Sequence, residues 1–272
     1  MENGILLPVL AAIVYSCTGA FALSTLWKRG GRAPAWLLCG IALALVLHAL
    51  ALRAGMFSSG EVRFGFGLAL SSAMFFSVAS LSVGAFFHRL GPVLGISSVI
   101  AGVAALLPLA FPGEVMPPRV WTPLFQLHLL IALLTYGLLA VDIVQAALLE
   151  FQNRTFRYSS DPVPQTGILS TLPPILMMEK VFFYILGAAF VTLTMLLVTG
   201  CFVTEENYGT LFHLDHKTFT TWIAWLLCAM LLAGRRFFGW RGTKAVRCFW
   251  ALCAVYAVAY LGYAFVIEQF IA

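Results

Sequence analysis

Charged side chains are scarce in this sequence. Lys, Arg, Asp and Glu make up 10% of its 272 residues, while hydrophobic residues make up 61%. Soluble domains carry about 25% charged residues, so this composition excludes an ordinary soluble domain. It indicates a protein that lies in a lipid bilayer, which is its first expected partner.

Long polar segments are also missing. A bilayer core about 30 Å thick needs roughly 20 apolar residues for each helical crossing. Eight stretches meet this requirement: residues 4–27, 35–56, 64–87, 93–111, 122–149, 180–203, 217–234 and 245–267. The first lacks a preceding basic segment and a clear cleavage site, so we expect a retained helix. We therefore predict an all-α polytopic membrane bundle in which residues 1–272 form a single domain of eight transmembrane helices.

Motifs of soluble enzymes are absent as well. The six cysteines fall within or at the ends of the apolar stretches and form no C-x-x-C pair, which is typical of small core residues. The sequence contains no P-loop, dinucleotide-binding fingerprint, G-x-S-x-G or H-E-x-x-H motif. We therefore expect no classical catalytic activity.

The few basic residues lie mostly on one side of the predicted bundle. Eight crossings assign all 16 Lys and Arg residues to one set of loops except Arg53, Arg63, Arg119 and Lys217. Because Lys and Arg accumulate in cytoplasmic loops, we expect both termini on the outer side of the membrane. This asymmetry accounts for the net charge of +5, so the charge does not indicate a nucleic-acid partner.

Histidines are concentrated near the predicted outer face. His48 lies in the outer half of the second stretch, His128 lies a turn and a half into the fifth, and His216 begins the seventh just after His213. We therefore expect these four residues to share one depth. Ionisable residues in membrane helices often mark a functional site, although hydrogen bonding between helices would also explain any one of them.

Imidazoles beside aromatic residues suit haem. Haem iron takes axial nitrogen ligands, and the macrocycle needs an apolar pocket. The aromatic residues expected near the histidines are Trp121, Phe125, Phe212, Phe219, Trp222 and Trp225. The haem carboxylates need cationic partners, for which this side offers Arg53, Arg119 and Lys217. We therefore predict haem as the cofactor.

The segment GTLFHLDHKTFTTWIAWLL resembles the cytochrome c assembly superfamily, in which a Trp-rich outer loop precedes Asp-Pro-Lys-Glu and a helix with the pattern T-W-x-x-x-W-L. HALALRAG, LHLLIALLTYGLLAV, LPPILMMEKVFF and GRRFFGWRGTKAVR resemble other parts of that superfamily, so the resemblance covers the whole chain. The chain looks most like the short eight-helix bacterial branch of YpjD-type inner-membrane proteins, which also resemble HemX. The resemblance implies haem handling in cytochrome c biogenesis, together with another membrane protein of haem or cytochrome maturation.

The resemblance also implies site residues. His128 resembles the first outer axial histidine and His48 a histidine of the second helix, but His216 stands where the family has proline, and the second axial ligand is unassigned. We infer that His216 supplies it, with His213 as the weaker alternative, because a helix N-terminus favours a neutral imidazole. Asp215 would orient an imidazole. The full predicted haem-binding set is His128, His216, His48, His213, Arg53, Tyr136, Phe212, Trp222, Asp215 and Lys217, with His128 and His216 as iron ligands.

Asp142 leaves a second function open. His128, Thr135 and Asp142 are spaced seven residues apart, so they share one helix face. Intramembrane carboxylates often mark transport paths, which favours a transporter or transport accessory for an ion or a small solute. The resemblance to the short branch of the superfamily adds magnesium as a candidate ion. Such a path should continue past Asp142 to the cytoplasmic side, whereas a haem site needs only the outer half. A third alternative is an accessory protein whose histidines are structural.

Overall fold

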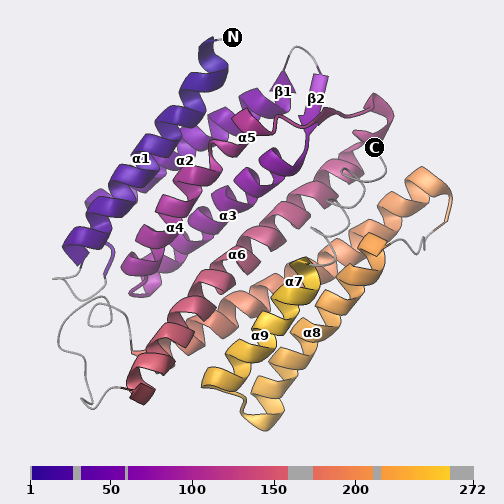
Figure 1. The fold of residues 1–272 in the computed structure, drawn as a ribbon. Coiled ribbons are helices and arrows are strands. Elements are labelled where there is room, and N and C mark those ends of the chain that lie inside the picture. The colour runs from indigo at the N-terminus through magenta and orange to yellow at the C-terminus, as the bar shows by residue number, and fades with distance from the viewer. Residues whose placement is uncertain (1, 27–31, 59–60, 159–173, 211–215, 258–272) are drawn as a thin grey trace.

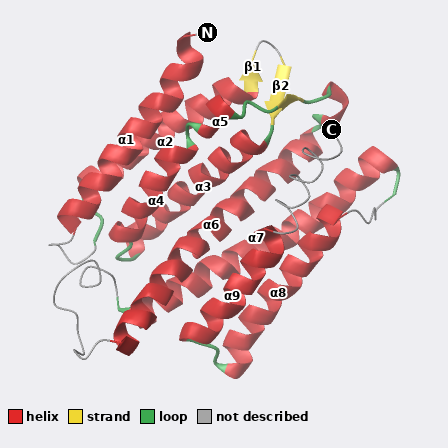
Figure 2. Ribbon diagram, in the orientation of Figure 1, coloured by secondary structure: helices red, strands yellow, loops and turns green. Residues whose placement is uncertain are grey.

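The computed structural model describes residues 2–26, 32–58, 61–158, 174–210 and 216–257. Long helices fill most of this part of the chain and run side by side as a bundle (Figures 1 and 2). The helices are α1 (Glu2–Leu26), α2 (Ala35–Met56), α3 (Phe66–Phe87), α4 (Gly91–Ala104), α5 (Leu107–Ala110), α6 (Pro123–Tyr158), α7 (Ile175–Tyr208), α8 (His216–Phe238) and α9 (Gly242–Ala257). The short segments are β1 (Phe57–Ser58), β2 (Glu61–Phe64), β3 (Glu114–Val115) and the 3-10 turn η1 (Pro118–Val120).

The predicted helical membrane bundle is confirmed. Within the described residues, seven spans are long and apolar enough to cross a membrane. The second span coincides with α2, while α6 and α7 continue beyond the predicted limits, to Tyr158 and back to Ile175. Hydropathy marks only the apolar part of a helix, so the prediction fell short at the polar end of α6. At the start of α7, the charged Glu179 interrupts the apolar run, and residues 175–178 were left out. The eighth predicted crossing begins within α9, and its last part lies outside the described residues.

Proline interrupts the fourth predicted crossing. Helix α4 ends at Ala104, and the short α5 begins at Leu107. The ring of Pro108 would clash with the carbonyl four residues earlier in a continuous helix, and proline has no N–H to donate. That carbonyl belongs to Ala104, where α4 ends. The predicted span 93–111 is therefore two helical pieces.

The interior contains two hydrophobic clusters that share α6. Helix α1 packs on α2 and α4, and α3 packs on α4 and α6, around the first cluster, which includes Tyr15 and Val141. Helices α6 to α9 surround the second, which includes Phe182 and Phe249. Because α6 contributes Val141 to one cluster and Leu149 to the other, it joins the two halves.

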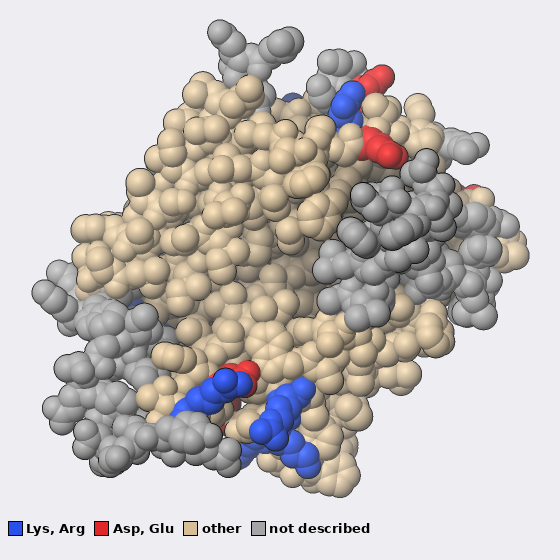
Figure 3. Space-filling model, in the orientation of Figure 1, with Lys and Arg blue, Asp and Glu red and all other residues tan. Residues whose placement is uncertain are grey.

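Basic side chains mark the end of the bundle where α8 and α9 meet (Figure 3). Arg235 and Arg236 lie in the last turn of α8, and Lys244 lies in the first turn of α9 over the ring of Trp240. The buried Glu179 carboxylate accepts a hydrogen bond from the backbone N–H of Gly242, at 2.6 Å. A carboxylate is favourable at a helix N-terminus, so Glu179 ties the start of α9 to α7.

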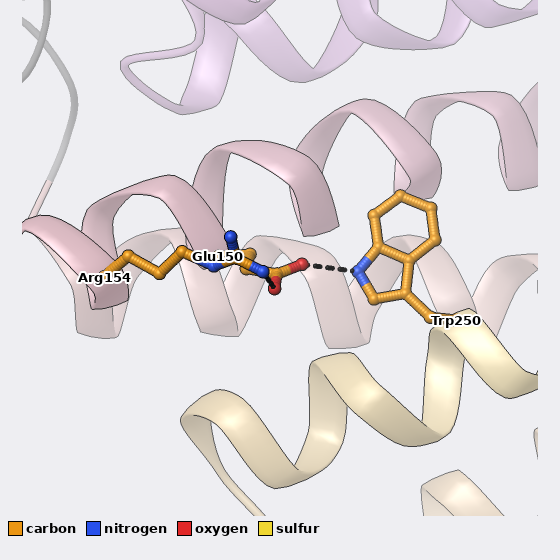
Figure 4. A network of polar contacts seen from close by, with 3 residues as sticks. All are labelled: Glu150, Arg154 and Trp250. Atoms are coloured by element: carbon orange, nitrogen blue, oxygen red, sulfur yellow. Dashed lines mark hydrogen bonds and ion pairs between the residues drawn. The ribbon is translucent and has the colours of Figure 1, made fainter.

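A second contact at this end joins α6 to α9. The indole Nε1 of Trp250 donates to Glu150 Oε2 at 2.9 Å, and Glu150 also pairs with Arg154 one turn further along α6 (Figure 4). The same carboxylate therefore neutralises a basic side chain and holds the two helices together.

Candidate functional site

His128 lies on α6 and is hydrogen-bonded to α7. Its Nδ1 is 2.9 Å from Thr199 Oγ1. Nearer the helix ends, the Thr122 hydroxyl donates to Glu206 of α7 at 2.9 Å. Between the Thr122–Glu206 bond and the His128–Thr199 bond, the residue number rises by six from Thr122 into α6 and falls by seven along α7. This is the pattern expected of two antiparallel helices. The two bonds therefore fix how α6 and α7 pair around His128.

The hydroxyl of Thr199 determines which nitrogen of His128 carries the proton. Thr199 donates its single hydroxyl proton within α7, to the carbonyl of Met195 at 2.9 Å or of Leu196 at 3.2 Å. When the proton is donated in this way, Thr199 accepts from His128, and the proton of the neutral ring lies on Nδ1. This leaves a lone pair on Nε2, the form in which imidazole binds a metal.

Helix α8 brings its first turn close to the level of His128. The indole Nε1 of Trp225 donates to Thr194 Oγ1 on α7 at 2.9 Å. His216 lies nine residues before Trp225 on α8, and Thr199 lies five residues after Thr194 on the antiparallel α7. At about 1.5 Å per residue, the backbone of His216 therefore lies about 6 Å beyond the level of Thr199. The side chains of His216 and Lys217 lie outside the described residues, as do Phe212, His213 and Asp215.

Aromatic side chains of α8 lie close to the level of His128 and Thr199 in the bundle. Trp222 is 40% exposed and contacts Trp225 edge to face, with ring centroids 6.5 Å apart. Trp225 also stacks on Phe190 of α7 at 5.3 Å. Tyr136, two turns deeper on α6 than His128, packs against the second hydrophobic cluster. Trp222 thus offers an open apolar face, whereas Tyr136 is mainly part of the core.

A separate aromatic contact lies beside the start of α6. The ring of Phe57 in β1 meets Trp121, and Trp121 meets Phe125, each at 6.1 Å between centroids. Arg53, in the last turn of α2, is exposed four residues before Phe57. This contact brings the end of α2 next to the start of α6, and the exposed guanidinium of Arg53 is available there for an anionic ligand.

His48 lies in a different environment from His128. It is fully buried, its Nε2 is 2.8 Å from Ser71 Oγ on α3, and the rings of Tyr15 and Phe75 meet it at 5.7 Å. Its Nδ1 has no hydrogen-bond partner among the described residues. His48 therefore offers no open nitrogen comparable to Nε2 of His128.

The two histidines also differ in depth. A Cβ on Gly137 of α6 would lie 2.8 Å from the carbonyl of Ala73 on α3, which places these two residues at one level. Counting back from this contact puts Ser71, and with it His48, about 10 Å deeper than His128. Whether His48 shares the depth of His128 therefore depends on how α2 pairs with α3 and how α3 pairs with α6.

Asp142 lies in the interior of the second cluster. Its side chain is fully buried, like those of Thr135 and Gln145 on the same helix. The hydroxyl of Thr135 donates to the carbonyl of Ile131, whereas both oxygens of Asp142 lack a hydrogen-bond partner among the described residues. Within the described residues, the Asp142 carboxylate therefore makes no hydrogen bond that would link two helices.

Three residues of these sites were missed from the sequence: Thr199, Gln145 and Glu179. Thr199 and Gln145 are polar within predicted apolar stretches, which is the only signal the sequence offered for them, whereas Glu179 lies just before the predicted stretch 180–203. Their partners could not be predicted, because they depend on which helices become neighbours.

Comparison with known proteins identifies the family. The chain is 26% identical over 263 residues to the inner membrane protein YpjD of Escherichia coli strain K12, covering 93% of this chain and 95% of that protein. It is 28% identical over 204 residues to an uncharacterized 28.8 kDa protein of Azospirillum brasilense, covering 74% and 72% of the two chains. The family model described as cytochrome C assembly protein matches residues 36–271. Since that match spans most of the chain, this membrane protein belongs to the cytochrome c assembly family.

Proposed function

We propose that the protein binds haem at the outer face of a bacterial inner membrane and handles it during cytochrome c biogenesis. One observation carries the proposal: Nδ1 of His128 is hydrogen-bonded to the Thr199 hydroxyl, an arrangement in which Nε2 can keep the lone pair that binds iron. Membership of the cytochrome c assembly family supports haem as the ligand. The likeness to an inner membrane protein supports the location.

The residues that hold the haem follow from this arrangement. His128 and His216, at the start of α8, would hold the haem iron. Trp222 would cover part of the macrocycle, and Arg53 would pair with a haem carboxylate. Bound haem would supply an iron centre that can change its oxidation state. The protein's own part is to fix the imidazole, exclude water and present the haem to another membrane protein of haem or cytochrome maturation.

The orientation of the bundle is part of the proposal. Basic side chains gather where α8 and α9 meet (Figure 3), and such residues accumulate on the cytoplasmic side. His128 lies toward the opposite end of α6, near Thr122 and Glu206. Both termini and the haem site then face the periplasm.

Absorption spectroscopy tests this function directly. The protein purified in detergent from haem-producing cells is expected to show a Soret band, with reduced-state bands typical of two axial histidines. Haem added to the purified protein should give the same spectrum at one equivalent. A protein that is folded, carries no haem and does not bind added haem would contradict the proposal.

Transport is the second candidate, and the polar residues beyond Asp142 favour it. Gln145 and Gln152 are buried on α6, and Asn153 adjoins Gln152 at the basic end of the bundle. In proteoliposomes, Asp142→Asn is expected to abolish flux of the transported ion, with magnesium as the first ion to assay. Haem absorption should be unchanged. Equal flux through the variant and the wild-type protein would remove Asp142 from any transport path.

A further inference from the structure

Asp142 and Gln145 form a buried polar pair in the second half of the bundle. Both side chains are fully buried, and none of their four side-chain oxygen and nitrogen atoms has a hydrogen-bond partner among the described residues. Residues three apart are neighbours on a helix surface, so the carboxyl and the carboxamide lie side by side. Unsatisfied buried polar groups are costly, and retaining two together points to a ligand.

Among the described residues, the surroundings of Asp142 provide no compensating charge. Its carboxyl lies within electrostatic range of the thiols of Cys228 on α8 and Cys253 on α9, which are the titratable groups facing it from those helices. Helix α7 contributes apolar Phe182 and Leu186 to the same cluster. None of the ion pairs among the described residues includes Asp142. An ionised carboxylate in this position would be buried without a counter-charge, which is strongly unfavourable.

The charge of Asp142 and the number of oxygen atoms in the pair indicate which ligand it can bind. The site supplies one negative charge, so one bound positive charge neutralises it. Within the described residues, no group of three His, Cys, Asp or Glu side chains is arranged to hold a metal ion, and magnesium or calcium requires about six oxygen ligands. A proton needs only a single carboxylate oxygen. The protonated acid can then donate a hydrogen bond to the neighbouring amide oxygen.

We propose that Asp142 and Gln145 form an intramembrane proton-binding site. On binding, a hydronium ion transfers its proton to Asp142: one O–H bond of the hydronium ion breaks, an O–H bond forms with one carboxylate oxygen, and a water molecule is released. This inference does not depend on haem binding, and it gives the second candidate function a defined site.

The polar residues nearest the site along α6 indicate where its proton comes from. Beyond Gln145, the next buried polar residue toward the basic end is Gln152, followed by Asn153, about 10 to 12 Å away along the helix. Asn153 and Glu179 both lie about 4 Å from where a Cβ of Gly242 would be. One oxygen of Glu179 is buried there without a hydrogen-bond partner among the described residues. The site therefore exchanges its proton with the end of the bundle that contains Glu179.

Infrared spectroscopy of the purified full-length protein tests the site. At neutral pH, the wild-type protein is expected to show the carbonyl stretch of a protonated carboxylic acid, which shifts in deuterium oxide. Asp142→Asn should lack this band. Glu114→Gln, which removes an exposed carboxylate in β3, is the matched control and should retain it. Asp142→Glu should move the band without abolishing it, which keeps the assignment testable if the asparagine variant folds poorly.

The salt and pH dependence of the infrared band distinguishes a bound proton from a bound metal ion. The band should persist in sodium and magnesium chloride and should decrease only as the pH is raised. Its exchange in deuterium oxide should slow in Glu179→Gln if the proton enters from that end. Two results would overturn the inference: a folded wild-type protein without the band at neutral pH, or a band that disappears when either salt is added.

Discussion

His128→Ala is expected to lose the haem absorption of the wild-type protein. The substitution removes the Nε2 lone pair that Thr199 makes available. Losing a residue that only orients a metal ligand typically lowers affinity about 10- to 100-fold, so losing the ligand itself should lower haem affinity by more than about 100-fold. Haem titration followed by absorption spectroscopy measures the change. Added imidazole should partly restore the spectrum, because it can replace the missing side chain.

Two further variants test the reason for this loss. Thr199→Val keeps the shape of the side chain but removes the hydrogen-bond acceptor, so it should weaken haem binding about 10- to 100-fold and leave the type of spectrum unchanged. His88→Ala alters a histidine just beyond the end of α3 and should have no effect. Unchanged haem content in the double variant His128→Ala, His216→Ala would exclude both residues as ligands.

Gly137→Leu is expected to prevent stable folding. A Cβ at Gly137 would lie 2.7 Å from the Cβ of Phe76 and 2.8 Å from the carbonyl of Ala73. Both are closer than such contacts normally are, and the carbonyl belongs to a helix backbone that cannot move independently. Overpacking a core commonly costs 1–3 kcal/mol; forcing apart α3 and α6 should cost about 3 kcal/mol or more, because this contact joins the two hydrophobic clusters.

Thermal unfolding in detergent measures this effect, together with the fraction of monodisperse protein. Gly187→Ala is the matched control, since a Cβ at Gly187 meets no atom within 4 Å. Alanine also favours a helix over glycine, so this variant should be at least as stable as the wild-type protein. Equal stability of Gly137→Leu and the wild-type protein would show that α3 and α6 do not pack as described.

The sequence predicted the membrane spans well because a single property, apolar length, determines them. It did not predict the break before Pro108, although the proline itself was visible, because a short kink leaves the hydropathy of the span unchanged. Nor did it predict where α6 and α7 end, since their polar last turns extend beyond the apolar stretch.

The candidate site was less predictable from the sequence. His128 and Asp142 stood out as ionisable residues in apolar stretches, and the resemblance drew attention to His128 and His216. The role of Thr199 and the depth of His48 depend on which helices are neighbours and how they are shifted along one another. These features depend on contacts between side chains that lie tens of residues apart in the sequence. Hydrophobic periodicity does not specify such contacts.

Helix α6 contains both His128 and Asp142, about 21 Å apart along its axis, and it is shared by the two hydrophobic clusters. A rotation or shift of this helix therefore changes the surroundings of both residues at once. If a ligand at one site favours one position of α6, thermodynamic reciprocity requires the other site's affinity to change by the same factor. Haem binding at His128 near the membrane surface and proton uptake by Asp142 in the interior would then both report one conformational equilibrium of α6.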